Sequence, residues 1–179
     1  ATGKTGVAFA TSGPGATNAL TGMMTAHMDS VPMVVMTGQS IRPMLGKDAF
    51  QEADIFDMAM PVVKHSYLVR ETDDIPRIFR EAFHITSSGR PGPVLIDIPK
   101  DVSAGICSMD TRVEMDLPGY KPVCAPDHEA IMEIAEALSK SRRPVLLVGH
   151  GALIAGASTQ VRAFAEKLKL PVINTMMAK

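Results

Sequence analysis

Five short apolar runs, separated by segments with helical periodicity, constrain the fold more than any other feature of this sequence. They are residues 6–10, 33–37, 94–98, 145–148 and 172–175. Four of the runs directly follow a proline, which suits the start of a strand because that position needs no ladder donor. Nearly continuous apolar runs, without polar alternation, are typical of strands covered on both faces. The sequence therefore predicts an α/β fold with a doubly wound parallel sheet.

The segments between these runs carry apolar residues at helical spacing. Residues 75–86, 131–138 and 161–168 each place an apolar stripe on one face of a helix. The first of them opens with acidic residues and a proline, both favoured in the first turn of a helix. We expect these segments to be crossover helices that pack on the sheet.

The regular pattern lapses between two parts of the chain. Residues 101–126 are interrupted by proline, glycine and serine and show no sustained period. We therefore expect residues 1–100 to be the C-terminal part of one doubly wound domain, residues 101–126 to be a linker, and residues 127–179 to begin a second, Rossmann-like domain. The sequence opens without an initiator methionine and stops after a predicted strand, so we expect a segment of a longer protein.

Charge and composition narrow the function classes. The formal net charge is −1 with no basic cluster, which argues against nucleic acid and membrane surfaces as partners. No apolar run approaches the roughly 18 residues of a membrane span. Cys107 and Cys124 are too few and too far apart for a zinc site or a disulfide framework, so we expect reduced thiols in a cytoplasmic protein. A small metabolite is the expected ligand.

The first candidate binding segment is the glycine-rich turn at residues 11–18, Thr-Ser-Gly-Pro-Gly-Ala-Thr-Asn. It lies between a predicted strand and a predicted helix, where Gly13 and Gly15 allow a tight turn. It lacks the Gly-Lys-Ser/Thr ending of a P-loop and the third glycine of the dinucleotide fingerprint. From these residues alone, an ordinary strand-to-helix turn remains an equal alternative.

The second candidate is the polar segment at residues 38–52, directly after the second predicted strand. In open α/β sheets, ligands bind beyond the carboxyl ends of the strands. Here Phe50 offers an aromatic wall beside Gln51, whose amide can both donate and accept hydrogen bonds. The alternative is a helix start capped by Asp48, with Phe50 packed inward.

Together with Ser-Gly-Arg-Pro-Gly-Pro at residues 88–93, these segments resemble the thiamine-diphosphate-dependent acetolactate synthase large subunit. The motifs stand in the family's order and the resemblance covers nearly the whole chain. It implies that residues 1–100 belong to the pyrimidine-side domain of the thiamine-diphosphate-binding fold. It also implies that Gln51 contacts thiamine diphosphate, that Phe50 lines the substrate cavity and that Lys100 stands at the mouth of the active site.

The resemblance further implies FAD contacts in both domains. Ser30 and Arg90 match FAD-contacting residues of the first domain. Thr175 and Met176 match a Thr-Leu pair of the central domain, and His150 lies in a turn suited to a phosphate or ribose, where the family has a run of glycines. From the residues alone, Arg90, like Lys100, would be a solvated surface charge.

The implied reaction condenses pyruvate with a second 2-oxoacid, with loss of carbon dioxide, in branched-chain amino acid biosynthesis. The glutamate that activates the cofactor is expected before Ala1. The Gly-Asp-Gly motif that holds the diphosphate and Mg2+ is expected after Lys179. The isolated segment is therefore expected to be inactive.

The family's active site forms between two subunits, which implies a second copy of the chain and, commonly, a small regulatory subunit. Two alternatives remain open from the sequence. One is a sister carboligase of the glyoxylate carboligase or sulfoacetaldehyde acetyltransferase type. The other is a non-catalytic, nucleotide-binding α/β module.

Overall fold

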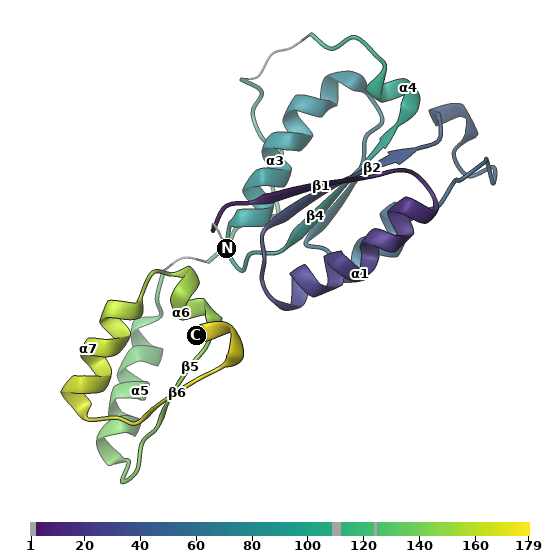
Figure 1. Cartoon of the computed structure of the whole chain (residues 1–179). Coiled ribbons are helices and arrows are strands. Elements are labelled where there is room, and N and C mark those ends of the chain that lie inside the picture. The colour runs from purple at the N-terminus through teal and green to yellow at the C-terminus, as the bar shows by residue number, and fades with distance from the viewer. Residues whose placement is uncertain (1–2, 109–111, 124) are drawn as a thin grey trace. The chain divides into compact units, whose positions relative to one another are not determined.

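The computed structural model describes residues 3–108, 112–123 and 125–179. The chain divides into two compact units, with the boundary between residues 123 and 124. Each unit is an arrangement of helices around a parallel sheet (Figure 1).

The first unit is built on a four-stranded, fully parallel sheet in the order β1-β2-β4-β3. Its strands are β1 (Gly6–Ala10), β2 (Met33–Gln39), β3 (His65–Leu68) and β4 (Pro93–Pro99). The three strands predicted in this unit are confirmed. Strand β3 was missed, because it lies at an edge of the sheet and mixes polar and apolar residues without a continuous apolar run.

Helices cover both faces of this sheet, so the doubly wound prediction is confirmed. The helices of the unit are α1 (Pro14–Met28), α2 (Ile55–Ala59), α3 (Ile75–Ser87) and α4 (Lys100–Ser103), with 3-10 turns η1 (Arg42–Met44), η2 (Met60–Val62) and η3 (Thr72–Asp74). None of the helices in the described ranges is long and apolar enough to cross a membrane.

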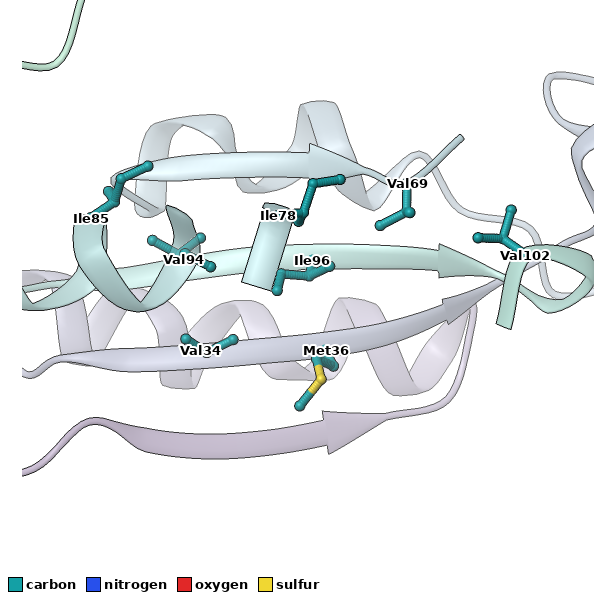
Figure 2. Packing of buried hydrophobic residues seen from close by; sticks show 9 residues of the cluster. Val34, Met36, Val69, Ile78, Ile85, Val94, Ile96 and Val102 are labelled. Carbon is teal, nitrogen blue, oxygen red and sulfur yellow. The ribbon is translucent and has the colours of Figure 1, made fainter. Parts of the chain in front are cut away.

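The two central strands explain the continuous apolar runs. Successive side chains of a strand point to opposite faces. Val34 and Ile96 pack with α3 in one buried cluster, whereas Val35 and Leu95 pack with α1 in another. Figure 2 shows the first cluster, in which residues from β2, β4 and α3 meet with Val69 and Val102. Because both faces are buried, neither strand needs polar alternation.

Strand β1 departs from this pattern. Its residues Val7 and Phe9 pair in register with Val34 and Met36, whose side chains lie on the α3 side of the sheet. Phe9 nevertheless remains 78% exposed and Val7 48% exposed. Only Ala8, on the opposite face, packs against a buried cluster. The expectation that all five apolar runs are covered on both faces is therefore wrong for β1.

Part of the expected linker packs on the first unit. Val102 is fully buried, and Leu117 and Tyr120 pack against the α3 cluster. The backbone N–H of Asp116 donates to the buried carboxylate of Glu81 on α3, at 2.8 Å. The first unit thus extends to residue 123, beyond the boundary expected at residue 100. Residues 109–111 and 124, also within the expected linker, lie outside the described residues.

The second unit contains the two remaining predicted strands as a parallel pair. Its elements are α5 (His128–Lys140), β5 (Leu146–Val148), α6 (His150–Ile154), α7 (Ser158–Leu168), β6 (Val172–Asn174) and the 3-10 turn η4 (Met176–Ala178). Asp127 caps α5 by accepting from the backbone N–H of Glu129 at 2.9 Å. Both predicted helices and both predicted strands are confirmed here. The expectation that the strands are covered on both faces is wrong for this unit too, since Leu147 on β5 is 66% exposed and Ile173 on β6 is 56% exposed.

Candidate functional site

Three residues singled out from the sequence lie at the carboxyl edge of the first sheet. The segment after β2, residues 40–54, carries Phe50 and Gln51 and is called the 40–54 loop below. Lys100 opens α4 directly after β4. Strands β2 and β4 pair as far as Gln39 and Pro99, so the loop and Lys100 leave the sheet at the same level. This is the edge where parallel α/β sheets bind ligands.

The ring of Phe50 projects from the 40–54 loop and is 89% exposed. The alternative of a helix start capped by Asp48, with Phe50 packed inward, is therefore wrong. The helix α2 begins only at Ile55, and its cap is Asp54, which accepts from the backbone N–H of Asp57 at 3.2 Å. An exposed aromatic side chain at a ligand-binding edge is available for contact.

Gln51 is held in an unusual backbone conformation, with φ at 55°. The left-handed region costs a residue other than glycine about 1–2 kcal/mol, so the surroundings must hold it there. One such contact is with Gly13, in the glycine-rich turn that precedes α1. A Cβ atom on Gly13 would lie 2.7 Å from the carbonyl oxygen of Gln51 and 3.0 Å from its Cβ. The two sequence motifs therefore meet at one place, and the close approach requires a glycine.

The 40–54 loop is braced from within by Glu52. Its carboxylate accepts from the backbone N–H of Ala49 at 2.8 Å and from that of Gly46. The hydrogen bond from Ala49, and to a lesser extent the one from Gly46, lowers the pKa of Glu52, because backbone donors favour the charged form of a carboxylate. The carbonyl of Ala49 in turn accepts from the Glu52 N–H at 2.9 Å. The loop thus holds its shape through its own hydrogen bonds.

Arg42 ties the start of this loop to the segments that follow β4 and β3. Its Nε lies 2.8 Å from Asp101 Oδ2, and its backbone N–H donates to Asp101 Oδ1 at 3.0 Å. Its Nη1 reaches the carbonyl of Arg70 at 2.8 Å and the carboxylate of Glu71 at 3.0 Å. The hydrogen bond from Arg42 lowers the pKa of Asp101. Because Asp101 follows Lys100, this ion pair links the loop to the strand end that carries the lysine.

A buried carboxylate lies beneath the same edge. Asp97 on β4 is 1% exposed, and it accepts from Thr37 Oγ1 at 2.6 Å and from Gln39 Nε2 at 2.9 Å. Burial raises the pKa of Asp97 to about 6, although both hydrogen bonds oppose the shift. Sequence reasoning missed this group. The signal was a lone carboxylate inside a run of residues that otherwise indicated a strand buried on both faces.

Ser30 and Arg90 come together at the opposite, amino edge of the sheet. Arg90 Nε donates to Ser30 Oγ at 2.8 Å, and Nη2 donates to the carbonyls of His27 and Met28 at 3.2 and 3.0 Å. These carbonyls end α1, where a cation is favoured. Arg90 is thus exposed, but its guanidinium is hydrogen bonded to protein oxygens, and it serves as a cap for α1. The pair does not share an edge with Gln51 and Lys100.

The remaining predicted residues lie in the second unit. His150 opens α6 after β5, and Thr175 follows β6, where its backbone N–H donates to the carbonyl of Val148 at 2.9 Å. Met176 begins η4 and is 85% exposed. Since β5 and β6 are parallel, all three residues lie at the carboxyl edge of this second sheet.

Among the residues that the structure describes, no three His, Cys, Asp or Glu side chains are grouped so that they could hold a metal ion.

Comparison with known families gives two matches. The N-terminal TPP binding domain of thiamine pyrophosphate enzymes matches residues 1–58, and the central domain of the same enzymes matches residues 131–179. The first match contains both Gly13 and Gln51, and the second ends with the segment that holds Thr175 and Met176.

Similar proteins include three acetolactate synthases. That of Mycobacterium leprae is 54% identical over 178 residues, that of Arthrospira platensis 50% over 182, and the large subunit of Corynebacterium glutamicum 49% over 177. Each alignment covers 99% of this chain but only 28%, 31% and 28% of the respective relative. The chain thus spans less than a third of the length of these relatives.

Proposed function

Because this chain belongs to the thiamine pyrophosphate enzymes, we propose that it is part of the catalytic large subunit of an acetolactate synthase. Identity of about half over the whole chain supports this assignment. The geometric observation that carries it is the contact of Gly13 with Gln51, which joins the two motifs at the ligand-binding edge of the sheet.

The residues at this edge fit the flat, polar pyrimidine ring of thiamine diphosphate. The amide of Gln51 can donate to and accept from ring nitrogens, and the exposed ring of Phe50 offers an apolar face. When bound, the cofactor supplies the carbanion chemistry that decarboxylation and condensation require. Gln51 would bind and orient the ring, while Phe50 would exclude water from the substrate side.

Lys100 places a positive charge at this edge. Its side chain is exposed at the end of β4, next to the loop that carries Gln51. We expect its ammonium group to attract the carboxylate of a 2-oxoacid at the mouth of the site. The proposed substrates are pyruvate and a second 2-oxoacid, joined with loss of carbon dioxide in the cytoplasmic synthesis of branched-chain amino acids.

FAD and Mg2+ are further parts of the proposal. The residues expected to contact FAD are Ser30 and Arg90 in the first unit and His150, Thr175 and Met176 in the second. Arg90 already donates from Nε and Nη2 to protein oxygens, so a flavin contact would add to its capping role. We expect Mg2+ to be held, with the diphosphate, by a part of the longer protein outside residues 1–179, and a second copy of the subunit to complete the site.

The test is the activity of the protein that carries this chain at the length of its relatives. With thiamine diphosphate and Mg2+, it should form acetolactate from pyruvate, whereas Gln51→Ala should bind thiamine diphosphate more weakly. Glyoxylate offered as sole substrate is the control. Turnover of glyoxylate without turnover of pyruvate would favour the sister carboligase. Failure to bind thiamine diphosphate would favour the non-catalytic module.

A further inference from the structure

Gln39 connects the buried carboxylate of Asp97 to the far end of the 40–54 loop. Its side chain is 8% exposed at the end of β2. One donor of Nε2 reaches Asp97 Oδ2 at 2.9 Å and the other reaches the carbonyl of Ala53 at 2.7 Å. Its Oε1 accepts from the backbone N–H of Ser40 at 2.9 Å. The amide therefore bridges the sheet core, the first residue of the loop and the last part of it.

Only a carboxamide of this length satisfies all three partners. Two of them, the carboxylate of Asp97 and the carbonyl of Ala53, need donors, while the N–H of Ser40 needs an acceptor. An apolar residue at position 39 would remove one hydrogen bond from each of these groups, which is costly. The carboxylate of Asp97 would keep only its bond from Thr37, and the carbonyl of Ala53 would keep only its bond from the N–H of Ile55. A carboxylate there would repel both Asp97 and the Ala53 carbonyl.

Ala53, which Gln39 holds, lies close in the chain to the residues proposed to contact the cofactor and substrate. Ala53 is two positions after Gln51 and three after Phe50, and the chain then enters the core at Ile55, which is fully buried. Arg42 holds the other end of the loop, but its side chain is 40% exposed, so solvent screens that ion pair. The hydrogen bonds of Gln39 are the buried anchor of the loop.

We propose that Gln39 is a positioning residue, which transmits the fixed position of Asp97 to Ala53 and so sets the place of Gln51 and Phe50. That Gln39 positions the loop is inferred from its hydrogen bonds to Asp97, Ala53 and Ser40. That this affects the binding of thiamine diphosphate rests on the proposed function.

Two variants of similar size separate positioning from general stability. Gln39→Met keeps the side-chain volume and removes the bridge. Thr37→Val is the matched control, since it removes the other buried hydrogen bond to Asp97 without touching the loop. Both should lower the melting temperature of the protein that carries this chain.

The deciding measurement is hydrogen exchange at the loop amides of Ala49 and Glu52, both of which are hydrogen bonded within the loop. Exchange should rise about tenfold in Gln39→Met and stay near wild type in Thr37→Val. Equal exchange rates in the two variants would overturn the proposal. Where Gln39→Met does not fold, Gln39→Asn replaces it, because the shorter amide cannot reach both Asp97 and Ala53.

Thiamine diphosphate binding then tests the proposed function separately. A faster-exchanging loop with a dissociation constant raised about tenfold supports both ideas. A faster-exchanging loop with unchanged affinity supports the positioning role of Gln39 and removes the cofactor from this loop.

Discussion

Gly13 and Gln51 touch through their backbones: a Cβ atom placed on Gly13 would lie 2.7 Å from the carbonyl oxygen of Gln51. Both residues have positive φ angles, 55° in each case. The glycine-rich turn before α1 and the loop after β2 are therefore in close contact, with no room for a side chain at position 13.

Gly13→Ala should weaken thiamine diphosphate binding by about tenfold or more and lower stability by about 1–2 kcal/mol. The added carbon pushes Gln51 away, and the positive φ strains the alanine. Calorimetric titration and a melting curve measure the two effects. Gly156→Ala is the matched control, because Gly156 also has a positive φ, 64°, but open space around it. Equal loss of affinity in both variants would contradict a specific contact with Gln51.

Gln51→Ala and Lys100→Ala should lower kcat or raise the KM for thiamine diphosphate or pyruvate, with little change in melting temperature. Both side chains are exposed at the carboxyl edge, where surface substitutions usually change stability by no more than about 0.5 kcal/mol. Steady-state kinetics and thermal unfolding of the full-length protein give the answer. Wild-type kinetics in both variants would remove these residues from the site.

Asp97 should titrate with a pKa near 6, measurable by carbon NMR of its carboxyl group. Because burial raises its pKa above the usual 3.8, the stability that it contributes is fully present below pH 3.8 and is lost as the pH rises through about 6. Wild type should lose roughly 3 kcal/mol over this range relative to Asp97→Asn. Parallel pH profiles of unfolding for the two proteins would refute the shift.

Arg90→Ala should reduce FAD retention in the full-length protein, since a hydrogen bond to a charged group contributes about 1.5–3 kcal/mol. It should also destabilise α1, whose last carbonyls it caps. For the stability of α1, Ser30→Ala is the comparison, because it removes one partner of Arg90 and leaves those carbonyl contacts in place. If flavin content is unchanged in a stable Arg90 variant, Arg90 serves only as a cap.

The sequence determined the elements whose signals are local. Five apolar runs, four of them directly after a proline, predicted five strands, and helical spacing predicted the crossover helices, because buried strands and helices must bury apolar residues at their own periods. The three motifs also pointed to the thiamine-diphosphate family before any geometry was known. Edge strand β3 was missed because a strand that mixes polar and apolar residues gives no strong periodic signal in the sequence.

The tertiary structure decided what depends on residues far apart in the chain. The Arg42–Asp101 ion pair, the bridge from Asp97 through Gln39 to Ala53, and the fit of Gly13 under Gln51 have no sequence signature. The packing of Leu117 and Tyr120 likewise extended the first unit into the segment expected to be a linker. Periodicity reports only whether a residue faces a core. Which residues meet depends on strand order and on where each loop leaves the sheet, and these arise from the chain as a whole.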